Sequence, residues 1–132
     1  MERLTVDDFF SGLFAALVLK GYVTISLRDE RFDRTLAALF QDFSARAQRQ
    51  GLDVRFRIRA HPIHGDSTTV RHGISDAAQR GVISLDNPEY QDIRIKLDAP
   101  RARRLLETMP GGSALFTELA HSFVLQYTAA IS

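Results

Sequence analysis

Apolar residues recur along the chain with two different spacings, one typical of helices and one typical of strands. Steps of three or four residues predict a helix from Val6 to Lys20, a second from Phe32 to Ala47 and a last helix that Ser113 caps. Strict alternation of apolar and polar residues predicts strands over residues 22–27 and 52–60. Helices and strands are therefore expected to share one core.

Turn and capping residues predict where these elements begin and end. Thr5 and Asp8 have the spacing of a capping box, in which two side chains satisfy backbone N–H groups at the start of a helix. Gly21 and Gly51 follow the first and second helices and are typical helix stops. Pro100 suits the first turn of a further helix that ends near Thr108.

The middle of the chain is polar and is interrupted by proline and glycine. Thr68–His72 is predicted to add a short edge strand, and Ser75 is predicted to cap a short helix that ends at Arg80. Two apolar runs, Val82–Leu85 and Gln91–Asp98, flank a turn and predict an antiparallel hairpin.

The order of these elements predicts the fold class. A strand, a helix and a strand follow one another over residues 22–60, and such a unit normally joins two parallel strands in a right-handed crossover. Together with the hairpin, this predicts a single α+β domain over residues 1–132. We expect a two-layer sandwich of about four mixed strands, covered by three long helices and one or two short ones.

The composition is that of a folded domain, and it excludes several kinds of site. The chain is 45% hydrophobic and 25% charged, with 17 basic and 16 acidic residues and a net charge of +1. This mixture is typical of a globular protein rather than a disordered one. The absence of cysteine excludes a disulfide framework, a thiolate zinc site, an iron–sulfur cluster and a cysteine nucleophile.

The longest apolar run, Phe9 to Leu19, is shorter than the about 20 residues that a membrane-spanning helix needs. The residues before it are net acidic, whereas a secretory signal begins with positive charge. We therefore expect a cytoplasmic protein that has no membrane partner.

The alternation in the predicted strands gathers positive charge on one side of the sheet. The residues opposite the core in the two clearest strands include five cations: Arg55, Arg57, Arg59, Arg94 and Lys96. Such a face is able to bind an anion or a nucleic acid through phosphates, although it lacks the aromatic residues that stack on bases. The alternative is a solvated face whose arginines pair with Asp53, Asp92 or Asp98 across strands.

A second candidate site is a histidine-rich segment. His61, His64, Asp66 and His72 lie within twelve residues, and imidazole and carboxylate groups are common ligands of zinc. Their spacing matches no helical zinc motif, and an exposed polar loop explains the same residues without a metal. A metal-dependent enzyme is one hypothesis for this segment; otherwise we expect no cofactor.

The first helix is apolar on both sides. If Phe9 and Leu13 face the sheet, the opposite side of the helix must be covered by the last helix or by another molecule. The candidate interface residues are Phe10, Phe14, Val18 and Tyr127. A symmetric homodimer is the simplest closed assembly that would cover them.

The sequence contains none of the common catalytic motifs. It has no phosphate-binding glycine loop, no dinucleotide-binding turn and no nucleophile elbow. The main hypothesis is therefore a small non-catalytic binding or accessory module that acts through protein–protein contacts, as a homo-oligomer. Binding of an anion or a nucleic acid through the basic face and a metal-dependent enzyme at the histidine segment are the alternatives.

Overall fold

The computed structural model describes residues 2–26, 31–58, 68–85 and 92–129. Within these residues, five helices and two small sheets confirm the α+β class. The helices are α1 (Val6–Leu19), α2 (Arg31–Arg49), α3 (Thr68–Gln79), α4 (Ala99–Thr108) and α5 (Gly112–Ala129). The strands are β1 (Arg3–Leu4), β2 (Thr24–Ser26), β3 (Asp53–Val54), β4 (Ile83–Ser84) and β5 (Asp92–Ile95).

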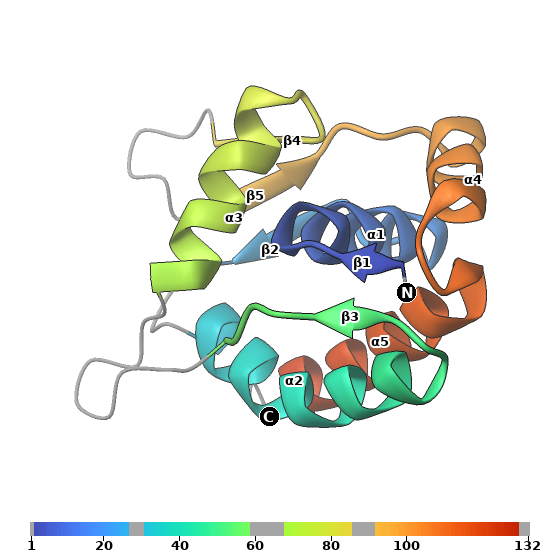
Figure 1. Cartoon of the computed structure of the whole chain (residues 1–132). Coiled ribbons are helices and arrows are strands. Elements are labelled where there is room, and N and C mark those ends of the chain that lie inside the picture. Colours follow the sequence, from blue (N-terminus) through green and yellow to red (C-terminus); the bar gives the residue numbers. More distant parts are fainter. Residues whose placement is uncertain (1, 27–30, 59–67, 86–91, 130–132) are drawn as a thin grey trace.

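Helix α1 lies at the centre of the molecule, with α3, α4 and β5 on one side and α2, α5 and β3 on the other (Figure 1). It packs against α3, α4 and α5. Every residue from Phe9 to Leu17 is buried. The helix is apolar all round because the protein covers it on every side over this stretch. Of the two alternatives for the second side of this helix, cover by the chain itself is therefore the one observed.

Local residues determine both ends of α1. The capping box is present: Thr5 Oγ1 accepts a hydrogen bond from the Asp8 backbone N–H at 3.1 Å, and Asp8 Oδ2 accepts one from the Thr5 N–H at 3.0 Å. After the helix, Gly21 adopts a φ of 93°, a conformation that is strained for any residue with a Cβ atom. The predicted start and stop of this helix are thus confirmed.

Two glycines allow neighbouring helices to approach α1 closely. A Cβ atom added to Gly12 would lie 2.4 Å from the ring of Phe116 in α5. A Cβ atom added to Gly73 in α3 would lie 2.2 Å from the ring of Phe10. Both distances are far shorter than a van der Waals contact between carbon atoms, so only glycine fits at either position.

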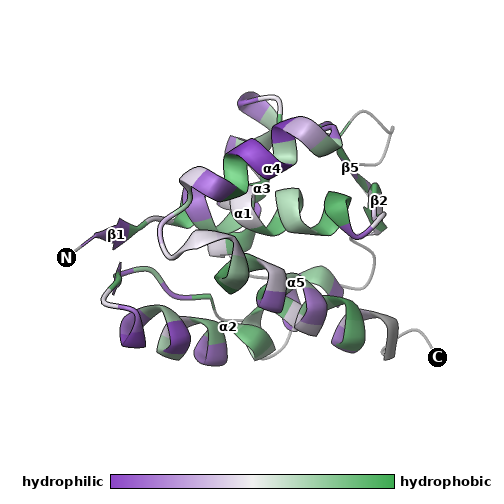
Figure 2. Ribbon diagram, turned by 90° about the vertical axis from the view of Figure 1, so that its right-hand side faces the viewer, coloured by the Kyte–Doolittle hydropathy of each residue, from purple (hydrophilic) through white to green (hydrophobic). Residues whose placement is uncertain are grey.

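Phenylalanine rings form the centre of the core. Phe9 makes edge-to-face contacts with Phe10 and Phe43, with ring centroids 5.2 and 4.9 Å apart. The Phe14 ring of α1 is stacked with that of Phe32 in α2, at 6.3 Å. Figure 2 shows the hydrophobic length of α1 inside the molecule and the hydrophilic outer side of α2. The core is thus built around α1 and the inner side of α2.

The strands pair differently from the predicted crossover. Strand β2 pairs antiparallel with β5, which also pairs antiparallel with β4, so the order of this sheet is β2-β5-β4. Strand β3 pairs parallel with β1 in a separate two-stranded sheet. The prediction that the strands at 22–27 and 52–60 are parallel neighbours in one sheet is therefore wrong. The antiparallel pairing predicted for the runs at 82–85 and 91–98 is confirmed by β4 and β5, whereas the turn predicted between them lies outside the described residues.

Residues Thr68–His72 form the first turns of α3, so the predicted edge strand here is wrong. Val70, Ile74 and Ala77 are buried at spacings of four and three residues, which is the period of a helix. The helix therefore starts well before Ser75, where the short helix was expected.

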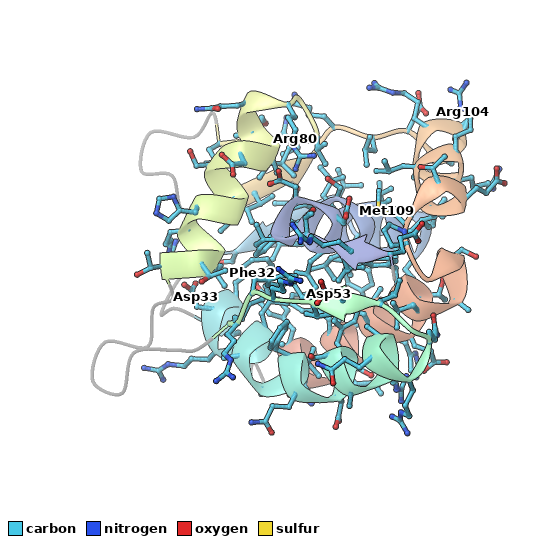
Figure 3. The ribbon with its side chains drawn as sticks, in the orientation of Figure 1. Phe32, Asp33, Asp53, Arg80, Arg104 and Met109 are labelled. Atoms are coloured by element: carbon cyan, nitrogen blue, oxygen red, sulfur yellow. The ribbon has the colours of Figure 1, made fainter. Side chains whose placement is uncertain are left out.

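Asp33, in the first turn of α2, is fully buried, although the next residue, Arg34, is exposed. Its Oδ1 accepts a hydrogen bond from Nη2 of Arg71 in α3 at 2.9 Å. Figure 3 shows Asp33 where the beginning of α2 approaches α3. A buried carboxylate needs such a partner, because it loses its hydration when the protein folds. This ion pair joins α2 to α3.

Candidate functional site

A groove of about 670 Å³ lies between α2 and the segment that continues β3. We call it the α2–β3 groove; its lining residues are Ala37, Phe40, Gln41, Ser44, Ala45 and Gln48 of α2 and residues 54–58 of the segment. Figure 1 shows β3 at the front of the molecule, with β1 above it and α2 below it. The volume lies in the range of ligand-binding sites, which is about 300–1,000 Å³.

Residues 54–58 keep the strand-like alternation that the sequence predicts. Arg55 and Arg57 are exposed, Val54 and Phe56 are half-buried and Ile58 is buried. Only the first residue of this segment, Val54, is paired with β1, because β1 ends at Leu4 and the chain turns into α1. The segment therefore presents two arginines to solvent and three apolar residues to the protein.

Positive charge exceeds negative charge on the side of the groove that residues 54–58 form. Asp53 Oδ2 accepts a hydrogen bond from Arg55 Nε at 2.8 Å and lies 3.8 Å from Arg3 Nε. Arg57 forms no ion pair with any residue that the structure describes. Arg3 and Arg55 thus share one carboxylate, which Figure 3 shows on β3, and Arg57 adds a third positive charge. The surplus charge creates a local positive potential that attracts anionic groups.

The α2 side of the groove is uncharged but polar. Gln41, Ser44 and Gln48 recur at three- and four-residue steps, so their side chains lie along one line of the helix. Amide and hydroxyl groups both donate and accept hydrogen bonds, as peptide groups require of a partner. Next to them, the rings of Phe40 and Phe56 lie 5.2 Å apart and provide an apolar floor.

The sequence interpretation missed the three polar residues of α2. It divided the helix into an apolar side and a charged side, and Gln41, Ser44 and Gln48 lie at the border between them. A stripe of uncharged polar residues at helical spacing is the signal that marks this border.

The five cations predicted to share one sheet face do not do so. Arg55 and Arg57 follow β3, whereas Arg94 lies in β5 and Lys96 directly after it, in the other sheet. All four are exposed. Arg59 lies outside the described residues. The prediction of a single basic face is wrong because the two clearest strands are not neighbours.

The histidine-rich segment falls mostly outside the described residues, which do not include His61, His64 or Asp66. His72 is described and is exposed on α3. Within the described part of the chain, no three histidine or acidic side chains are gathered as a metal ion would require. The metal hypothesis therefore stays a prediction.

The predicted interface residues lie inside the protein. Phe10 and Phe14 have exposed fractions of 0%, and Val18 and Tyr127 are half-buried. Phe10 is covered by Gly73 of α3, and Phe14 is covered by Phe32 of α2. These residues provide no exposed apolar patch, and this basis for a homodimer is removed.

Tyr127 joins the end of α5 to β2. Its hydroxyl donates a hydrogen bond to the Ser26 carbonyl oxygen at 2.9 Å and accepts one from the Ser26 N–H at 3.1 Å. Its ring is stacked with that of Phe123 at 5.2 Å, and the Arg31 guanidinium lies 5.4 Å from the ring centroid. The side chain is therefore used within the chain rather than at an interface.

We expect Tyr127→Phe to lower the free energy of unfolding by about 1–2 kcal/mol, because the two hydrogen bonds to Ser26 are lost while the ring contacts remain. The matched control is Tyr22→Phe, since Tyr22 is 38% exposed. Urea unfolding followed by circular dichroism measures both. An equal, negligible effect of the two variants would contradict the role of the Tyr127 hydroxyl.

Comparisons with protein-family models, curated proteins and solved structures find no match to this chain. None of the helices in the described part combines the length and the apolarity that crossing a membrane requires. The candidate site is therefore assigned on the residues of the groove alone.

Proposed function

We propose that this chain is a binding module that holds an acidic segment of a partner protein in the α2–β3 groove. The observation that carries the proposal is the charge of the groove: among the described residues that line it, Arg55 and Arg57 are charged and none is acidic. Complementary charge speeds the encounter of two proteins and suppresses binding of partners with the wrong charge.

The rest of the lining fits a polypeptide better than a nucleic acid. Gln41, Ser44 and Gln48 match the hydrogen-bonding groups of a peptide backbone, and the apolar floor at Phe40 suits apolar side chains. A nucleic acid needs a longer basic track or exposed rings that stack on bases. The cations that would lengthen such a track, Arg94 and Lys96, belong to the other sheet.

The groove residues also favour binding over catalysis. Among the lining residues that the structure describes, none is a histidine, a carboxylate or a lysine, the usual groups for proton transfer. Self-association of the chain, its cytoplasmic location and metal binding at the histidine segment stay predictions. Light scattering and elemental analysis of the purified protein test the first and the last of these.

The binding experiment uses a fluorescently labelled short peptide in which glutamate and valine alternate. We expect R55E combined with R57E to weaken binding of this peptide by at least about tenfold, because attraction is replaced by repulsion. The matched control is R94E combined with K96E, which changes the net charge equally on exposed residues of the other sheet. Fluorescence anisotropy at two salt concentrations measures both variants, and circular dichroism verifies their folding.

Equal weakening by the two double variants would contradict the proposal, because net charge rather than the groove would then explain binding. Tighter binding of a single-stranded RNA than of the peptide, with the same dependence on Arg55 and Arg57, would instead assign the groove to nucleic acid.

A further inference from the structure

Strand β3 has one edge that is paired and one that is not. The Asp53 N–H donates to the Glu2 carbonyl oxygen at 2.8 Å, so Asp53 directs its backbone groups towards β1. Successive residues of a strand direct these groups to opposite edges. Val54 therefore directs its N–H and C=O away from β1, and in the continuing alternation Phe56 and Ile58 do the same.

The edge of β3 that points away from β1, which we call the open edge, has no hydrogen-bond partner among the described residues. Within the described ranges, the sheet that contains β3 has only β1 as a second strand, and no backbone hydrogen bond is found from Val54, Phe56 or Ile58 to another described residue. The edge opposite β1 faces the α2–β3 groove, whose lining includes all three residues. An open edge of this kind is a template for another extended chain.

We infer that the acidic partner binds as an added β-strand along the open edge of residues 54–58, which rests on the proposed function and specifies its binding mode. The added backbone pairs with Val54, Phe56 and Ile58, and the groove between this edge and α2 receives it. This is the same mode by which extended peptides bind other exposed sheet edges, with main-chain hydrogen bonds for affinity and alternate side chains for specificity.

The alternation of residues 54–58 defines the sequence that fits. In an added strand, every second side chain points to the solvent face and lies across from Arg55 or Arg57, where a carboxylate gains a cross-strand ion pair. The side chains between them point towards Phe40 and Phe56, where apolar groups are buried. The expected partner segment therefore has about five residues that alternate between acidic and apolar.

The same charges disfavour a second copy of this chain as the occupant. If two copies paired through this edge, Arg55 and Arg57 of one copy would face the same arginines of the other. Like charges directly opposite each other destabilise a strand pair. A partner with acidic residues is favoured by the same pair of side chains.

The test compares two isomers of the alternating glutamate–valine peptide with the wild-type protein. One isomer carries N-methyl groups on the glutamates, and the other carries them on the valines. A methyl group removes a donor only where the N–H faces β3, and the N–H groups of alternate residues face opposite edges. We expect one isomer to bind at least about tenfold more weakly than the other, since several hydrogen bonds are lost in only one of them.

Which of the two isomers binds more weakly also reveals whether the added strand runs parallel or antiparallel to β3. In a parallel strand, the residues that share the face of Arg55 direct their N–H groups to β3, so the glutamate-methylated isomer loses binding. In an antiparallel strand, the valine-methylated isomer loses binding. Either difference supports strand addition, whereas equal affinities of the two isomers would overturn it and leave peptide binding by the groove intact. Failure of the unmethylated peptide to bind would contradict the proposed function itself.

Amide hydrogen exchange measured by NMR provides a second readout on the protein. Saturation with the unmethylated peptide is expected to slow exchange at Val54 and Phe56 but not at Arg57, whose N–H has the opposite direction in the alternation. Equal slowing at all three amides would contradict strand addition, because simple shielding of the groove would explain it.

Discussion

Phe14→Ala is expected to lower the free energy of unfolding by about 3–5 kcal/mol, because it removes a large ring from the core and leaves a cavity. Phe14 has an exposed fraction of 0% and lies between Phe10 and Phe32, with ring centroids 6.2 and 6.3 Å away. Folded domains are stable by about 5–15 kcal/mol, so this variant would lose a large part of its stability. Urea unfolding followed by circular dichroism measures the change.

The matched control is Leu125→Ala in α5. Leu125 is 57% exposed, and truncation of a surface side chain normally changes stability by about 0.5 kcal/mol or less. The comparison separates the two interpretations of the first helix. If Phe14 formed an exposed interface, its truncation would cost as little as that of Leu125 and would change only the oligomeric state.

Gly73→Ala is expected to lower the free energy of unfolding by about 2–3 kcal/mol, although alanine is the better helix former by about 1 kcal/mol. The new methyl group would lie 2.2, 2.3 and 2.9 Å from three ring carbons of Phe10. That ring is fully buried against Phe9 and Phe14, so α3 must move away from α1. Thermal and urea unfolding measure the effect, and Ser75→Ala on the exposed side of α3 is the control.

A smaller side chain at position 10 should partly relieve the overlap between the new methyl group and the Phe10 ring. We expect Gly73→Ala combined with Phe10→Leu to cost less than the sum of the two single substitutions, because the methyl group occupies space that the ring has left. Strict additivity of the two free-energy changes would show that the overlap between Gly73 and Phe10 is not the cause.

Local signals predicted α1 and α4 well, although they failed at the start of α3. The capping box at Thr5 and Asp8, the glycine after α1 and the proline in the first turn of α4 act within a few residues, so the sequence contains the whole interaction. The antiparallel pair of β4 and β5 is also local, since only seven residues separate the two strands in the sequence. In these elements tertiary contacts and local preference agree.

Strand pairing was predicted less well, because it depends on residues far apart in the sequence. The alternation over residues 52–60 is strong, but its partner β1 has only two residues and gives no periodic signal. The sequence therefore favours the nearest strong strand, at 22–27, as the neighbour, whereas β2 pairs with β5. For the same reason, the sequence does not determine whether the chain itself or another molecule covers α1, since it does not show which helices pack against Phe14.

The candidate site was partly predictable. The exposure of Arg55 and Arg57 follows from the two-residue alternation, which therefore predicts both as candidate binding residues. The groove itself requires α2 to lie along the open edge of β3, and this depends on the packing of Phe40 and Phe56. The sequence therefore indicated the charged side of the site but not the surface opposite it.

If Arg55 and Arg57 select an acidic segment in the α2–β3 groove, reversing their charge must reverse the preference for the partner's charge. The variant R55E combined with R57E is titrated with two peptides that differ only in carrying glutamate or lysine between the valines. The wild-type protein is predicted to prefer the glutamate peptide and the variant to prefer the lysine peptide, each by about tenfold. An unchanged preference of the variant for the glutamate peptide would contradict the claim.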